Sequence, residues 1–201
     1  MRELGPILPV LVIDDPQVAE PLGRALLASG IGQVEVTLRT GAALDALRIL
    51  AAIPGLRVGA GTVLSAVQAD AAAEAGAQFL VSPGLSDEVL SAARAAGIPA
   101  VPGIATATEL MRARSHGLRT VKFFPAEQSG GRAAVAALAA VFPDVSFVPT
   151  GGIDADRARD YLHHPSVLAV GGSWMVPRDA IASGDIPRVE ALCREAVEAL
   201  E

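Results

Sequence analysis

The feature that most constrains the fold of this chain is an alternation of short apolar runs with alanine-rich segments, repeated eight times over 201 residues. The short runs are rich in valine, isoleucine and phenylalanine, which is typical of buried strands. The segments between them space their apolar residues three or four apart, as in Val18, Leu22 and Leu26, and often end at a glycine, which indicates helices with one buried face. The predicted strands are 7–13, 33–38, 57–61, 79–82, 100–102, 120–124, 146–150 and 167–171.

Eight strand–helix units predict parallel strands joined by right-handed crossovers, which form either a closed barrel or an open, doubly wound sheet. An open sheet that binds a dinucleotide normally carries Gly-x-Gly-x-x-Gly after its first strand. Here Gly59-Ala60-Gly61 follows the third strand and lacks the third glycine. The chain is also just long enough for an eight-unit barrel, which needs roughly 200 residues. We therefore predict an α/β fold with one domain over residues 1–201, a (β/α)8 TIM barrel.

Composition excludes several classes of partner. The chain is 51% hydrophobic with a net charge of -6, which is typical of a globular protein and argues against nucleic acid binding. The apolar stretch 7–13 is too short for a membrane span or signal peptide and is closed by Asp14-Asp15, so we expect a cytoplasmic protein. The lone Cys193 falls on the apolar face of the last predicted helix and is predicted to be a core thiol.

The single lysine, Lys122, lies inside the apolar strand 120–124, whereas the fifteen other permanent cations are arginines. A drift of composition towards arginine explains those fifteen residues, but it does not explain why the remaining lysine lies in a strand. Arginine stays protonated, whereas a lysine amine can lose its proton and condense with a carbonyl to form a Schiff base. Because a buried, unpaired ammonium is costly, we predict that Lys122 is catalytic.

The second strand places Glu35, Thr37 and Arg39 on one face and valines on the other, because side chains alternate along a strand. In an ordinary strand, the glutamate and arginine would most simply form an ion pair. In a barrel this polar face points inward, where Glu35 can act as a general acid and base and Arg39 can hold a carboxylate through two hydrogen bonds. The same alternation directs Lys122 inward, towards Glu35.

Other candidate residues lie where further strands end, which in a barrel is the end that carries function. Thr62 and Pro83 follow the third and fourth strands and are unremarkable singly. Glycine pairs follow the seventh and eighth strands, the two places where barrels often bind phosphate through backbone N–H groups. Plain turns are the alternative, but two pairs in those two loops favour a phosphate site over Gly151, Gly152, Gly171, Gly172 and Ser173.

Metal chemistry finds no support in the sequence. His116 is expected in a loop before the sixth strand, and His163-His164 at the end opposite the barrel mouth, so no ligand cluster is predicted. Asp87 and Asp154 are predicted to cap helices, and Asp14-Asp15 to cap the first helix. Trp174 is expected to pack over the loop after the eighth strand rather than to stack on a cofactor.

With these residues placed, the chain resembles the bacterial class I 2-keto-3-deoxy-6-phosphogluconate (KDPG) / 4-hydroxy-2-oxoglutarate (KHG) aldolase family from about Pro9 to Val176. Six blocks carry the resemblance in order and at fitting spacing. They are Glu-Val-Thr-Leu-Arg-Thr at 35–40, Gly-Ala-Gly-Thr-Val at 59–63, Ser-Pro-Gly at 82–84, Lys-Phe-Phe-Pro-Ala-Glu at 122–127, Pro-Thr-Gly-Gly-Ile at 149–153 and Gly-Gly-Ser-Trp at 171–174.

The resemblance implies a Schiff-base aldolase of the Entner-Doudoroff pathway that cleaves KDPG to pyruvate and glyceraldehyde 3-phosphate, and KHG to pyruvate and glyoxylate. It also implies a cytoplasmic homotrimer without metal or other cofactor. The implied roles are Schiff base for Lys122, proton transfer for Glu35, carboxylate binding for Arg39 and Thr62, pocket walls for Pro83 and Phe124, a substrate-chain contact for Thr150, and phosphate binding for Gly151, Gly152, Gly171, Gly172 and Ser173.

Two other functions fit the same phosphate-binding barrel. A sugar-phosphate isomerase or epimerase would use Lys122 only as a bound charge and would form no imine. A non-catalytic binding protein would bind phosphate esters without turnover. The convergence of an amine and a carboxylate on one rim favours the aldolase.

Overall fold

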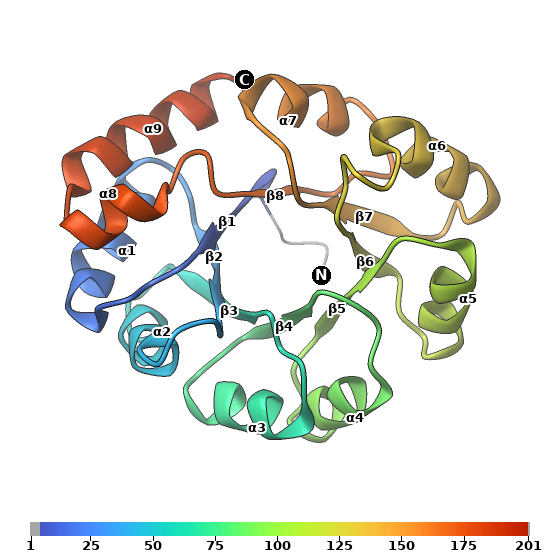
Figure 1. Cartoon of the computed structure of the whole chain (residues 1–201), viewed down its shortest axis with the longest axis horizontal. Helices are drawn as coiled ribbons and strands as arrows, with labels where there is room; N and C mark the ends of the chain where they lie inside the picture. Colours follow the sequence, from blue (N-terminus) through green and yellow to red (C-terminus); the bar gives the residue numbers. More distant parts are fainter. Residues whose placement is uncertain (1–4, 201) are drawn as a thin grey trace.

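All eight predicted strands form, and they pair in parallel in the order β7-β6-β5-β4-β3-β2-β1-β8. The computed structural model describes residues 5–200. Bridges from Phe147 to Val167 and from Thr150 to Gly171 join the two outer strands and close the ring. Figure 1 shows the closed barrel with the helices around it, which confirms the predicted (β/α)8 fold. The strands are β1 Ile7–Leu11, β2 Gln33–Thr37, β3 Arg57–Gly61, β4 Phe79–Ser82, β5 Ala100–Ile104, β6 Thr120–Phe123, β7 Ser146–Pro149 and β8 Val170–Gly172.

Several strand boundaries differ from the prediction by one to three residues. The first strand ends at Leu11, and the expected continuation to residue 13 is wrong; the last strand begins at Val170 rather than at residue 167. The fifth strand runs on through Gly103 to Ile104. Apolar composition does not reveal these limits, because a strand ends where its neighbour stops offering hydrogen-bond partners.

The helices lie outside the sheet and follow the strands one by one, with two helices after β8 (Figure 1). Their inner faces are rich in alanine and leucine, and these residues form the outer core between sheet and helices. Cys193 is fully buried in this layer, as predicted. The helices are the short 3-10 helix η1 Pro16–Val18, then α1 Ala19–Ala28, α2 Ala43–Ala51, α3 Ala66–Glu74, α4 Asp87–Ala95, α5 Ala107–Ser115, α6 Gly131–Val141, α7 Ala155–Leu162, α8 Arg178–Ser183 and α9 Ile186–Glu198.

The predicted helix caps are partly wrong. Asp154 caps α7, as expected, by accepting a hydrogen bond from the backbone N–H of Arg157. Ser86, not Asp87, caps α4, since Ser86 has the extended backbone that lets its hydroxyl reach the N–H of Val89. Asp15 caps η1 rather than α1.

Asp14 caps no helix. Its carboxylate instead accepts two hydrogen bonds from Arg178, at 2.8 and 2.9 Å. This bidentate pair connects the loop after β1 to the start of α8, the helix that follows β8. The strands β1 and β8 are neighbours in the ring. A sequence pattern could not show this contact, because the two residues are 164 positions apart.

An apolar layer lies inside the barrel. This interior cluster joins the side chains Leu8, Phe79, Val81, Val101, Val148 and Ala169. Gly59 makes room for the largest of them, since a Cβ at Gly59 would overlap the Phe79 ring. Polar side chains lie on either side of this layer, with Gln33 at the start of β2 and Glu35 and Thr37 further along the same strand.

Candidate active site

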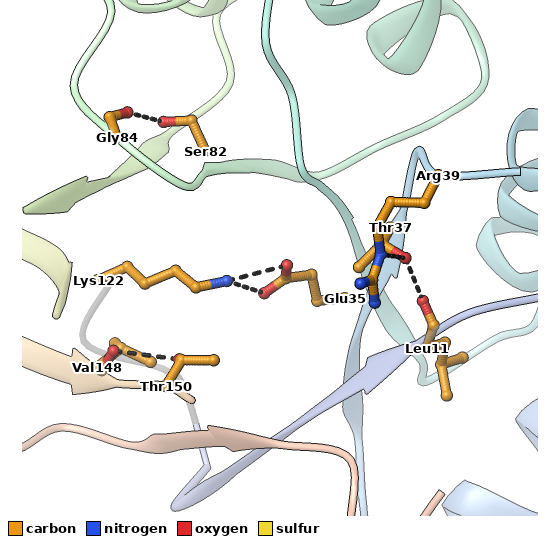
Figure 2. A network of polar contacts seen from close by, with 9 residues as sticks. All are labelled: Leu11, Glu35, Thr37, Arg39, Ser82, Gly84, Lys122, Val148 and Thr150. Atoms are coloured by element: carbon orange, nitrogen blue, oxygen red, sulfur yellow. Dashed lines mark hydrogen bonds and ion pairs between the residues drawn. The ribbon is translucent and has the colours of Figure 1, made fainter. Parts of the chain in front are cut away.

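Lys122 and Glu35 face each other across the inside of the barrel (Figure 2). The lysine Nζ lies 3.2 Å from Oε1 and 3.3 Å from Oε2 of the glutamate. Only 8% of the lysine side chain and 1% of the glutamate side chain are exposed. The predicted meeting of amine and carboxylate is therefore present as a buried, bidentate contact.

The topology explains why these two residues meet. Glu35 lies on β2 and Lys122 on β6, four strands apart in a ring of eight, so their inward side chains start from opposite walls. Their neighbours on the sheet are glycines: Glu35 is level with Gly59, and Lys122 with Gly103. A Cβ at Gly61 would overlap the Glu35 carboxylate, so this glycine creates the space that the carboxylate occupies.

Phe124 lies beside the lysine, as its inward position predicted. Its ring centroid is 5.4 Å from the Lys122 Nζ, which is within the range of a cation–π contact. Val121 and Phe123 point the other way and are fully buried in the outer core. The alternation along β6 thus separates the reactive side from the packing side.

Arg39 lies beyond β2 rather than on it. The strand ends at Thr37, and the backbone turns so that the Arg39 N–H donates to the Thr37 carbonyl at 2.8 Å. The strand thus ends two residues before Arg39, yet the side chain still turns towards the mouth, where the polar face of the strand was predicted to lie. Arg39 is exposed at the mouth, and its Nε donates to the Thr37 hydroxyl, which itself donates to the Leu11 carbonyl (Figure 2).

The loops after β3 and β4 have unusual backbone requirements. Thr62 has a φ of 56°, a left-handed conformation that is strained for a β-branched residue. In the next loop the Ser82 hydroxyl donates to the Gly84 carbonyl at 2.7 Å and shapes the turn at Pro83. A Cβ at Gly103 would overlap the Pro83 carbonyl, so that glycine on β5 lets the turn lie close to the barrel.

The structure brings the two predicted phosphate loops together. Thr150 pairs with Gly171, which joins the end of β7 to β8. Gly151 and Gly152 both have positive φ, 105° and 75°, which favours glycine. Gly171 and Gly172 instead make space for neighbours, since their Cβ atoms would overlap Thr150 and the Trp174 ring. Trp174 therefore packs against its loop, as expected.

Metal ligands do not gather in the part of the chain that the structure describes. No group of three or more histidine, cysteine, aspartate or glutamate side chains is placed to hold an ion within residues 5–200. His116 ends α5, and its Nε2 lies 3.0 Å from an Asp87 oxygen. The polar groups described at the mouth include the Lys122 amine, the Glu35 carboxylate and the Arg39 guanidinium.

The sequence matches those of known proteins over nearly its whole length. The family model for KDPG and KHG aldolases matches residues 1–192. The chain belongs to the KDPG and KHG aldolase family. The KHG/KDPG aldolase of Escherichia coli K12 is 50% identical over 195 residues, which are 96% of this chain and 92% of that protein. Members of this family are aldolases, which are carbon–carbon lyases.

Two solved aldolase structures agree in fold and carry small molecules. The 2-keto-3-deoxy-6-phosphogluconate aldolase of Zymomonas mobilis with 3-phosphoglycerate is 47% identical with a TM-score of 0.91, covering 97% of this chain and 92% of that one. The KDPG aldolase of Legionella pneumophila, with pyruvate captured as a covalent carbinolamine intermediate, is 42% identical with a TM-score of 0.93, covering 97% and 95%.

Sequence reasoning missed the residues that shape this aldolase site without reacting. Gly61 and Gly103 clear space for Glu35 and for the Pro83 turn, and Ser82 holds that turn. Their strand positions carried a signal, because a glycine inside a strand often marks a close approach of another group. The sequence could not show which group approaches, since that depends on the neighbouring strand.

Within residues 5–200, no helix is long and apolar enough to span a bilayer.

Proposed function

We propose that this chain is a class I aldolase that cleaves KDPG to pyruvate and glyceraldehyde 3-phosphate, and KHG to pyruvate and glyoxylate. Lys122 is the Schiff-base residue and Glu35 the general acid and base. The observation that carries the proposal is the direct contact between the buried Lys122 amine and the Glu35 carboxylate, 3.2 Å apart. The carboxylate can accept the proton that the lysine must lose before its amine attacks a carbonyl.

The contact supplies the first chemical steps. Transfer of a proton from the Lys122 ammonium to Glu35 produces a neutral amine, which attacks the C2 ketone of the 2-keto acid. The resulting carbinolamine loses its hydroxyl as water when Glu35 returns the proton. The product is a protonated imine between Lys122 and C2, and Glu35 is again a carboxylate.

The same carboxylate then carries out cleavage. Glu35 removes the proton from the C4 hydroxyl, the C3–C4 bond breaks, and its electron pair flows into the imine to form an enamine. The C4 carbon leaves as an aldehyde. Glu35 returns the proton to C3 of the enamine, and water hydrolyses the imine to release pyruvate and restore the amine.

The remaining site residues orient the substrate. Because Arg39 is exposed at the mouth and stays charged, it suits the substrate carboxylate, with Thr62 beside it. Pro83 and Phe124 wall the pocket, and Thr150 contacts the substrate chain. The two glycine loops and the serine that follows them bind the phosphate. These residues are Gly151, Gly152, Gly171, Gly172 and Ser173.

Two relatives support the proposed imine chemistry and the proposed binding of a substrate phosphate. The Legionella protein holds pyruvate as a carbinolamine, the intermediate that precedes a Schiff base. The Zymomonas protein holds 3-phosphoglycerate, a three-carbon phosphate similar in size to glyceraldehyde 3-phosphate. We extend both properties to this chain. We also propose that this chain is a cytoplasmic homotrimer that works without a metal or other cofactor. Light scattering measures the mass of the assembly and so tests the trimer.

Borohydride trapping tests the proposed chemistry. The protein is incubated with pyruvate and sodium borohydride, with and without a chelator, and its peptides are analysed by mass spectrometry. We expect a pyruvate adduct on the peptide that contains Lys122, in equal yield with chelator, and none in the Lys122→Arg variant. No adduct in the unaltered protein, with phosphate-ester binding intact, would overturn the proposal in favour of an isomerase or epimerase.

A further inference from the structure

Three polar side chains form a network beside the glycine turn after β7, and the mechanism above does not use them. The Tyr161 hydroxyl donates to Glu127 Oε1 at 2.7 Å. The Arg157 Nε lies 3.3 Å from Glu127 Oε2. Glu127 belongs to the loop after β6, whereas Arg157 and Tyr161 lie on α7, so the network joins that loop to the helix after β7.

Two residues of the network also donate hydrogen bonds to the carbonyl groups of the glycine pair. The Glu127 N–H donates to the Gly151 carbonyl at 3.2 Å. The Arg157 Nη1 donates to the Gly152 carbonyl at 3.3 Å. Each peptide unit is planar and trans, so the N–H that follows a carbonyl points away from it. Fixing these two carbonyls therefore fixes the direction of the Gly152 and Ile153 N–H groups.

Those two N–H groups are available as donors. Neither makes a backbone or side-chain hydrogen bond to any residue between 5 and 200. Successive backbone N–H groups in a turn can form a concave anion site, and the positive φ of Gly151 and Gly152 places glycine at this turn. The turn thus offers donors on the side away from the carbonyls that Glu127 and Arg157 occupy.

The network also depends on the turn for its own position. A Cβ at Gly152 would lie 2.9 Å from Glu127 Cγ, so glycine at this position lets the glutamate pack beneath the turn. Tyr161 is 1% exposed, and its pKa is raised by burial first and by Glu127 second, so its hydroxyl stays a donor. Arg157 also pairs with Asp154 at 2.6 Å, at the start of α7.

From this geometry we infer that Glu127, Arg157 and Tyr161 are positioning residues for the phosphate end of the substrate. They hold the Gly151 and Gly152 peptide units so that the Gly152 and Ile153 N–H groups bind a phosphate oxygen. They thereby set the preference of the enzyme for phosphorylated over unphosphorylated 2-keto acids. This inference rests on the proposed aldolase function and deepens it.

Charge explains why a glutamate can lie so near a phosphate site. The Glu127 carboxylate pairs with the cationic Arg157 and accepts a hydrogen bond from the neutral Tyr161 hydroxyl, so part of its charge is offset before a phosphate arrives. Removing Arg157 both loosens the turn and leaves more negative charge near the phosphate, whereas removing the Tyr161 hydroxyl loosens the turn and leaves the carboxylate less well compensated. Both effects weaken binding of a phosphate and have no counterpart for a substrate that lacks one.

Steady-state kinetics on both substrates test the inference. For Tyr161→Phe and for Arg157→Gln, we expect KM for KDPG to rise roughly three- to tenfold, the effect typical of losing one hydrogen bond. The kcat for KDPG and both constants for KHG should stay within about twofold of the unaltered enzyme. Inhibition by inorganic phosphate should weaken by the same factor as KDPG binding.

Two matched variants sharpen the test. Arg194→Gln removes an arginine from an exposed pair with Glu190 on α9 and should leave all constants unchanged. Glu127→Gln keeps an oxygen that accepts from Tyr161 and should retain more KDPG affinity than Glu127→Ala.

Loss of activity on KDPG and KHG alike, or no change on KDPG, would overturn the positioning role. Failure of the aldolase proposal itself looks different, because the unaltered enzyme would then cleave neither substrate and form no pyruvate adduct.

Discussion

The Glu35 carboxylate occupies the space that a side chain on Gly61 would fill. Glu35 lies on β2 and Gly61 near it on the neighbouring strand β3, where Thr37 and Gly61 are level. The carboxylate can therefore bend over the strand beside it and reach Lys122 on the far wall. One glycine without chemistry of its own decides where the proton acceptor of the site lies.

Gly61→Ala should displace Glu35 and slow turnover by roughly a hundredfold or more, the loss typical of a missing general base. Overpacking should also lower the free energy of unfolding by about 1–3 kcal/mol. Kinetics and urea unfolding measure the two effects. Gly41→Ala is the control, because a Cβ there meets nothing within 4 Å. Unchanged turnover in Gly61→Ala would contradict the role of this glycine.

Lys122→Arg should abolish turnover and leave no pyruvate adduct. Arginine keeps the positive charge beside Glu35 but stays protonated, so it cannot attack a carbonyl. Circular dichroism should show a folded barrel, since the buried carboxylate keeps a cationic partner. Appreciable residual cleavage of KDPG in a coupled assay would exclude the Schiff-base role.

Glu35→Gln should turn over roughly a hundred- to ten-thousandfold more slowly, because the amide can accept neither the Lys122 proton nor the C4 hydroxyl proton. Steady-state kinetics measures this loss. Borohydride trapping should also form the pyruvate adduct more slowly, since the same carboxylate serves imine formation in the proposed mechanism. Turnover at the rate of the unaltered enzyme would exclude its role as general base.

Thr62→Gly should separate stability from activity. Removing a β-branched residue at a φ of 56° relieves strain of about 1–3 kcal/mol, which offsets the roughly 0.5–1 kcal/mol entropic cost of glycine. We therefore expect the free energy of unfolding to stay the same or rise. The KM for KDPG should increase, since the hydroxyl proposed to hold the substrate carboxylate is gone. Unchanged KM would show that the strained residue does not bind substrate.

Cys193 should resist thiol reagents in the folded protein. Burial first, and the charge of Glu190 second, raise the pKa of this thiol to about 12. A thiol in the unfolded chain ionises near 8.5, so its contribution to stability is complete below that pH and is lost as pH rises towards 12. We expect slow labelling at pH 9 that becomes fast in urea, and a flatter loss of stability above pH 9 in Cys193→Ala. Fast labelling of the folded protein would contradict the burial.

Particular residues show how far pattern alone could go. The alternation along β6 correctly placed Lys122 inward, because a strand has a fixed period of two residues. The same rule could not show that β2 ends at Thr37 and that Arg39 reaches the mouth from a turn of the backbone. The sequence correctly predicted Asp154 as the cap of α7. At α4 the cap is Ser86, one position before the predicted Asp87, because Ser86 has the extended backbone of a capping residue.

By itself the sequence determined the repeated strand–helix unit, the barrel and the residues able to do chemistry, since these follow from local periodicity and side-chain type. Only the tertiary structure decided how closely the predicted amine and carboxylate approach, that Gly61 opens space for Glu35, and that α7 braces the turn at Gly152. Those contacts join residues from about 5 to 87 positions apart. Their distances depend on how the ring closes, which no local pattern encodes.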